Sequence, residues 1–203
     1  GIIAGQSAGI DAYSVTATNS GTISGGSFAL RAIGDLTLDN SGDIVANTNP
    51  SPNTAAVKAW GGATAITNSG RIWGDSGYGI YAEVYVKNTP VGSFKLTNTG
   101  TIGGNIGVAT ASNSVSTVSA TIVNSGTISG YSAAISTDGD LTLDNSGWIK
   151  SIGDSGDWRG VAAHGVTTKI TNSGTIDNSG VYGTGIVADS TDANASLTLA
   201  NSG

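Results

Sequence analysis

The 203-residue sequence contains no cysteine and no methionine, and it has few charged, aromatic or proline residues. The absence of cysteine excludes disulfide bonds and thiolate metal sites. Charged residues make up only 11% of the chain, the formal net charge is −6, and the eight basic residues are scattered. Because phosphate binding needs clustered Lys and Arg, neither a nucleic acid nor an anionic membrane is expected as the partner. No cofactor or metal ion is expected either.

The sequence also lacks an apolar run long enough to span a bilayer, and its first residues do not form a signal peptide. Good helix formers are scarce, and Glu83 is the single glutamate. Glycine, at 32 residues, is abundant, together with Ser, Thr, Asn and β-branched residues. This composition favours an all-β fold with many turns.

An Asn-Ser/Thr-Gly triplet recurs along the whole chain at intervals of 21 to 30 residues. Self-similarity with this period is typical of a solenoid, in which each repeat forms one coil, and the triplets predict about eight coils. Both ends of the sequence fall at the same phase of the repeat, so we expect it to be a segment of a longer array. The triplets begin at Asn19, Asn40, Asn68, Asn98, Asn124, Asn145, Asn172 and Asn201.

Each unit also contains three short apolar patterns. Before the Asn, apolar and polar residues alternate, as Leu36 and Leu38 do before Asn40, which is typical of a strand with one buried face. A small-apolar-x-small pattern, as in residues 56–59, forms another strand and is looser in the units of Ile106 and Ile135. Four residues after the Asn stands an unbroken isoleucine column: Ile23, Ile44, Ile72, Ile102, Ile128, Ile149 and Ile176.

Three short strands per unit predict a coil with three faces. One coil cannot bury its inner face alone, so each strand is expected to pair in parallel with its copy in the next coil, about 4.8 Å away. The predicted fold is therefore a parallel β-helix, or β-solenoid, that forms a single domain over residues 1–203. The usual chirality of parallel crossovers predicts a right-handed coil.

The Asn-x-Gly column has a structural interpretation in such a fold. Each Asn amide is expected to donate to and accept from the next, as in the Asn ladders of cross-β assemblies. The Gly two residues later is expected to adopt a positive φ angle, which other residues adopt only at a cost. The alternative for this motif is a ligand site repeated in every coil.

The nine residues GDLTLDNSG occur at 34–42 and again at 139–147. Coils four apart match in sequence and in interval, which indicates that a four-coil block, residues 19–123, was duplicated in residues 124–203. The repeated segment is interpreted as a strand with its turn, and therefore as scaffold.

The longer units carry insertions at two of the three corners, where solenoids usually place their functional residues. These insertions are predicted at residues 46–54, 74–77, 150–159 and 177–184, and at residues 85–93, 110–118 and 189–195. The unit around Asn68 is also rich in aromatic residues, which predict a recognition patch for a sugar or a protein; alternatively, these rings cover exposed edges of the core. The aromatic residues are Trp60, Trp73, Tyr78, Tyr81 and Tyr85.

Some motifs resemble catalytic or metal-binding sequences. Gly-Asp-Ser-Gly, at 74–77 and 153–156, copies the nucleophile motif of chymotrypsin-like proteases, and His164 follows Ser155 by nine residues. In that family the His and Asp precede the Ser, so both copies are interpreted as turns. Isolated acids such as Asp35 and Asp39 are interpreted as turn residues rather than calcium ligands. A polysaccharide-acting β-helix enzyme is the weaker alternative, and no enzymatic activity is expected.

The L-T-L-x-N-S-G-x-I-x-G units, as in residues 141–147 and 124–130, resemble those of passenger domains of Gram-negative autotransporter adhesins. The resemblance covers the whole chain, although its motif is structural and identifies no binding residue. It implies display at the bacterial surface, with outer-membrane anchoring through a region outside these residues. It also implies adhesion to a host-cell or matrix protein or glycan, or self-association. A two-partner-secreted haemagglutinin is the alternative.

Overall fold

The computed structural model describes residues 1–47, 54–84, 91–112, 117–154, 156, 158–190 and 192–202. Within these ranges every regular element is a β-strand. Tyr85 and Ser155 lie outside the described residues, as do parts of the insertions predicted at 46–54, 85–93, 110–118, 150–159 and 189–195.

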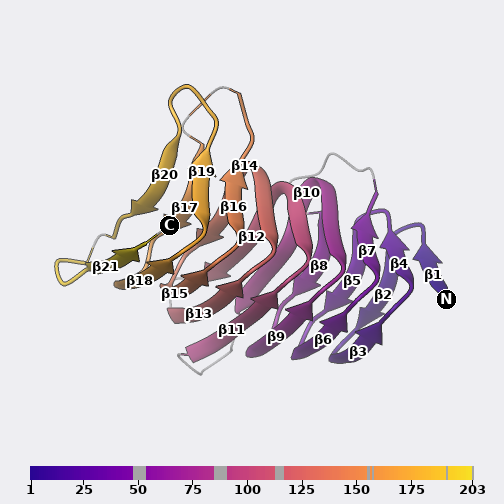
Figure 1. The fold of residues 1–203 in the computed structure, drawn as a ribbon. Helices are drawn as coiled ribbons and strands as arrows, with labels where there is room; N and C mark the ends of the chain where they lie inside the picture. Colours follow the sequence, from indigo (N-terminus) through magenta and orange to yellow (C-terminus); the bar gives the residue numbers. More distant parts are fainter. Residues whose placement is uncertain are drawn as a thin grey trace.

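The strands form three faces of a solenoid (Figure 1). The first face contains β1 (Ile2–Gly5), β4 (Thr22–Gly25), β7 (Asp43–Ala46), β16 (Trp148–Ser151) and β19 (Thr175–Asn178). The second contains β2 (Ala8–Ala12), β5 (Phe28–Ala32), β8 (Ala55–Ala59), β17 (Arg159–Ala163) and β20 (Thr184–Ala188). Three long strands run over both of these faces: β10 (Arg71–Val84), β12 (Thr101–Ser112) and β14 (Thr127–Thr137). The third face contains β3 (Val15–Asn19), β6 (Leu36–Asn40), β9 (Ala63–Asn68), β11 (Val91–Asn98), β13 (Thr117–Asn124), β15 (Asp140–Asn145), β18 (Thr167–Asn172) and β21 (Ser196–Asn201).

Neighbouring coils pair in parallel, and equivalent residues of the repeat lie opposite one another. Ile44 is the partner of Ile72, and Asn40 is the partner of Asn68. Figure 1 shows the coils stacked in sequence order from the N-terminus to the C-terminus. The predicted parallel β-helix is therefore confirmed. The number of coils needs a small correction: the third face has eight strands, but its two outermost strands have a neighbour on one side only, which leaves six turns that are stacked on both sides.

The prediction of three separate strands per coil is wrong for the coils that contain β10, β12 and β14. In these coils the strands of the first and second faces merge into one bent strand, with a register shift at the bend in β10 and β12. Residues 74–77, predicted to form an inserted turn, lie at the bend of β10. On either side of this bend, residues 71–74 and 78–84 pair with the neighbouring coils, so the strand continues from the first face to the second.

The core is a set of side-chain columns that run along the axis. The isoleucine column is buried from Ile23 to Ile149, and Phe94 and Leu96 are buried on the third face. Val108, rather than Ile106, occupies the second-face core position, because it pairs with Ile80 and Ile135. Stacking buries these side chains by covering each layer with the next, which is the main stabilising term in a solenoid.

The asparagine side chains form a continuous hydrogen-bonded ladder. Each Asn Nδ2 donates to the Oδ1 of the Asn in the next coil, at 2.7–2.8 Å, from Asn19 to Asn201. The same Nδ2 atoms also contact backbone carbonyls, as Asn98 Nδ2 does with Gly100 O and Thr127 O. Asn201 is exposed because it lies in the last coil, whereas the other seven are buried. A buried polar column is tolerated here because its amides are hydrogen-bonded.

The glycines of the triplets do not adopt the positive φ angles expected from the sequence. Gly156 is the one glycine with positive φ among the described residues. A triplet glycine is needed instead because the coils approach closely: a Cβ on Gly42 would lie 2.1 Å from Gly21 O, and one on Gly100 would lie 2.1 Å from Gly70 O. Glycine is therefore required at this position by the close approach of neighbouring coils, and not by the local backbone conformation.

The repeated segment contributes one further contact between coils. Asp35 Oδ1 accepts a hydrogen bond from the Ala63 N–H at 3.0 Å, and its counterpart Asp140 Oδ1 accepts one from the Thr167 N–H at 2.8 Å. Both contacts join one coil to the next. No helix in the described part of the chain has the length and hydropathy needed to cross a membrane.

Candidate functional site

The predicted aromatic residues lie on two different faces. Trp60 directly follows β8, and Tyr78 and Tyr81 lie on the second-face part of β10. Trp73 lies on the first-face part of β10, where it pairs with Val45 and Gly103. The structure therefore brings three of the five predicted residues to one face and leaves Trp73 on another.

Two basic residues and a phenylalanine join these rings on the second face. The register aligns Asp11 with Arg31, Arg31 with Lys58, and Lys58 with Tyr81, one residue per coil. Phe28 lies in the same coil as Arg31. We call the group of Phe28, Arg31, Lys58, Trp60 and Tyr81 the cation–aromatic cluster.

Lys58 is at the centre of this cluster. Its Nζ lies 4.4 Å from the centroid of the Trp60 ring, 5.1 Å from that of Phe28 and 5.2 Å from that of Tyr81. The residue is only 5% exposed although it points away from the solenoid core. Burial lowers the pKa of its ammonium group, and the nearby Glu83 carboxylate opposes that shift. Cation–π attraction to three rings compensates part of the lost hydration.

Arg31 is held by an ion pair with the preceding coil. Its Nε donates to Asp11 Oδ1 at 2.8 Å, and its Nη2 donates to Asp11 Oδ2. This two-point hydrogen bonding is the strongest reason why the pKa of Asp11 is lowered and that of Arg31 is raised. The guanidinium carbon also lies 5.4 Å from the Phe28 centroid and 5.9 Å from the Trp60 centroid. The bidentate pair thus fixes the cation against two rings.

Tyr81 is the third ring of the cluster and contacts a second tyrosine. Its centroid lies 4.8 Å from that of Tyr78, with the planes at 45°. Its hydroxyl donates a long hydrogen bond, 3.4 Å, to Glu83 Oε2. Burial, followed by the Glu83 charge, raises the pKa of Tyr81 to about 12. The phenol is therefore neutral in the physiological pH range.

The surface next to the cluster is apolar. Tyr13 and Ile33 stand at the same corner position as Trp60, one per coil, as shown by the Ile33 N–H donating to Ala12 O and the Trp60 N–H donating to Ala32 O. Tyr13 is 76% exposed and Ile33 is 43% exposed. The opposite charges of Asp11 and Arg31 are paired, so the cluster presents ring faces and aliphatic groups more than charge. Such a surface has the apolar character that suits contact with a partner.

Trp73 has a different environment. A Cβ on Gly103 would lie 2.3 Å from Trp73 Cζ3, which shows that the indole lies directly over this glycine of the next coil. The Arg71 guanidinium carbon is 5.1 Å from the indole centroid. The ring therefore covers a gap in the first face, as in the cross-strand aromatic–glycine pairs of other sheets.

Phe28, Arg31 and Lys58 were missed as site residues in the sequence. The signal was present in the x position of the small-apolar-x-small pattern, which reads Asp11, Arg31, Lys58 and Tyr81 in successive units. Reading that outward position as a column would have placed an acid, two bases and a tyrosine side by side.

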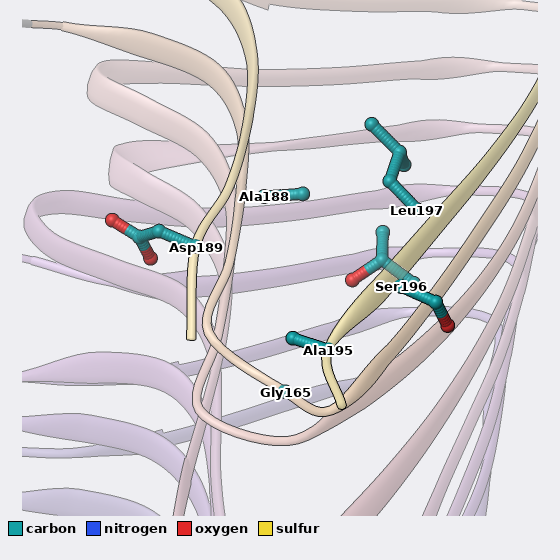
Figure 2. A pocket seen from close by; sticks show the side chains of 7 residues that line it. Gly165, Ala188, Asp189, Ala195, Ser196 and Leu197 are labelled. Atoms are coloured by element: carbon teal, nitrogen blue, oxygen red, sulfur yellow. The ribbon is translucent and has the colours of Figure 1, made fainter. Parts of the chain in front are cut away.

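A histidine–aspartate pair and a small pocket lie near one another at the last coil. The His164 Nδ1 lies in hydrogen-bond contact with Asp189 Oδ1, and both residues are partly exposed. Near this pair, at the last coil, lies a pocket of about 70 Å³ (Figure 2). Figure 2 shows Ala188 and Leu197 beside it, with the Asp189 carboxylate pointing away from Leu197. The pocket is smaller than the roughly 300–1,000 Å³ that is typical of small-molecule sites. The described residues contain no group of three or more His, Asp or Glu placed to hold a metal ion.

Comparisons with known proteins identify no similar family, protein or structure. No protein-family model, no curated protein and no solved structure matches this chain.

Proposed function

We propose that this β-solenoid is an adhesive segment displayed at a bacterial surface, in the manner of autotransporter passenger domains, and that it attaches the cell to a host-cell or matrix component or to neighbouring cells. The cation–aromatic cluster carries the proposal. Most outward positions of the solenoid are Thr, Ser, Ala or isolated charges, so they differ little from coil to coil. A selective contact needs a place where this regularity is broken.

The cluster has the composition that dominates protein interfaces. Trp, Tyr and Arg supply large contact areas at low entropic cost and are enriched among the residues that contribute most binding energy. Here the rings are held in place before binding, because Lys58 contacts three of them and the Asp11 pair fixes Arg31. Preorganisation of this kind lowers the entropy lost on association.

The test compares adhesion of beads coated with the purified chain and with the Trp60→Ala/Tyr81→Ala variant. Beads are applied to cultured epithelial cells, to immobilised matrix proteins and to a surface coated with the chain itself. We expect the variant to lose at least about tenfold in binding to the partner that the unaltered chain binds, as expected when central aromatic residues are truncated. The matched control is Tyr182→Ala, which removes a ring that is 74% exposed and outside the cluster.

The rings also cover Lys58, so folding is measured in parallel by circular dichroism and thermal melting. Equal binding by the double variant and the unaltered chain, below the melting temperature of both, would show that the rings serve only as cover. Loss of binding in Tyr182→Ala to the same degree would also count against the cluster.

A further inference from the structure

A shallow polar groove crosses the corner between the third and first faces in the first coils. It has a volume of about 400 Å³, and its lining includes Ser41, Gly42, Asp43, Gly70 and Arg71. These residues belong to the Asn-x-Gly turns and to the starts of β7 and β10. The groove is separate from the cation–aromatic cluster, which lies on the second face.

The floor of the groove is backbone whose polar groups are already bonded. The Gly42 N–H donates to Asn19 O at 3.2 Å, and Gly21 O accepts from the Asp43 N–H at 2.8 Å. The close approach of the coils excludes a side chain at the glycine positions. Recognition must therefore come from the two walls.

One wall carries hydroxyl groups and the other carries charges. Ser20 and Ser41 are exposed and lie one coil apart, about 4.8 Å along the axis. The Ser41 hydroxyl donates to Asn19 O at 3.2 Å, so its oxygen remains able to accept a hydrogen bond. On the other wall the register aligns Asp43 with Arg71. Both are exposed, and neither forms an ion pair within the described residues.

This combination defines the chemistry of a ligand. An unpaired carboxylate accepts hydrogen bonds, an unpaired guanidinium donates them, and their charges cancel locally. A polyanion would be repelled by Asp43 and by the chain's net charge of −6. A polycation would be repelled by Arg71 within the groove. A neutral molecule with many hydroxyl groups matches both walls, because each hydroxyl both donates and accepts.

We propose that this groove binds a neutral linear polysaccharide that lies along the solenoid axis. Asp43 accepts hydrogen bonds from sugar hydroxyls, Arg71 donates hydrogen bonds to sugar oxygens, and the serine oxygens accept one hydrogen bond per coil. The site goes beyond the proposed adhesive cluster, since it uses another face and another class of contact.

The test is isothermal titration of the purified chain with neutral gluco-, manno-, xylo- and galacto-oligosaccharides of two to six sugars, and with an oligogalacturonate as the anionic comparison. We expect one neutral series to bind, with affinity that rises with length. Asp43→Ala and Arg71→Ala should each weaken this binding at least about tenfold, the effect of losing a hydrogen bond to a charged group. Lys95→Ala, an exposed position on the third face, is the matched control and should bind like the unaltered chain.

Three results would overturn the proposal: no binding of any neutral series, stronger binding of the oligogalacturonate, or unchanged affinity in the Asp43 and Arg71 variants. The Trp60→Ala/Tyr81→Ala variant separates this site from the adhesive cluster. It should keep its affinity for the neutral oligosaccharide, and loss of that affinity would place the sugar at the cluster instead. Both groove variants should melt like the unaltered chain, because the side chains removed are exposed.

Discussion

At the scale of single residues, the asparagine and its glycine perform different tasks within one triplet. The Asn98 amide is buried, accepts from Asn68 and donates to Asn124, both at 2.8 Å. Gly100 allows the coils to approach. The residue between them, Thr99, is exposed, and its hydroxyl makes one long contact of 3.5 Å with Asn68 O. The structure therefore assigns the stability of the triplet to its first and third positions.

Asn98→Ala should consequently reduce the free energy of unfolding by about 2–4 kcal/mol, because the buried Asn124 Oδ1 loses its donor and Asn68 Nδ2 loses its shortest acceptor contact. Gly100→Ala should also destabilise, since its Cβ would overlap Gly70 O. Thr99→Ala should change the free energy of unfolding by less than about 0.5 kcal/mol, as exposed substitutions usually do. Urea unfolding of the three variants measures these differences. Similar losses in Asn98→Ala and Thr99→Ala would refute the ladder's energetic role.

At the scale of elements, β10 and β12 show how a side chain on one strand depends on the strand beside it. Trp73 of β10 lies over Gly103 of β12, where a Cβ would be 2.3 Å from the ring. We expect Gly103→Ala to destabilise the protein by about 1–3 kcal/mol, the usual cost of overpacking. In a Trp73→Ala background the same change should cost much less, because the obstructing ring is gone.

A double-mutant cycle from urea unfolding gives the coupling between the two positions. A coupling of at least about 0.5 kcal/mol is expected for groups in direct contact. Additive effects of Trp73→Ala and Gly103→Ala would show that the indole moves aside freely. That result would return Trp73 to the set of rings available to a partner.

At the scale of the whole molecule, each coil is stabilised by the coil on either side of it. The inner strands of the third face are covered on both sides, whereas every residue of β21 is exposed. Stability in such a stack is a sum of nearest-neighbour terms. Amide hydrogen exchange should therefore be slowest in β9, β11 and β13 and fastest in β1–β3 and β19–β21. Uniform exchange rates along the chain would contradict this and indicate a single all-or-none transition.

The architecture could be predicted from the sequence because every coil of a solenoid needs the same residue types at the same positions of the repeat. The columns of Ile23 to Ile176 and Asn19 to Asn201 could be read without knowing how the chain turns. The merging of strands in β10 could not be read, since it depends on pairing with both neighbours. The candidate site was predicted only in part. Trp60 and Tyr81 were identifiable as aromatic residues, but their contacts with Lys58 depend on two neighbouring coils being placed in register.

The asparagine ladder gives the solenoid an electrical direction. All seven amide-to-amide hydrogen bonds run the same way, from Nδ2 of one coil to Oδ1 of the next. Aligned amide dipoles polarise one another, so the row has its positive end at Asn201 and its negative end at Asn19. A coil inserted in reverse would set N–H against N–H on one side and oxygen against oxygen on the other. The ladder thus acts as a polarity rule that admits each new coil in only one orientation.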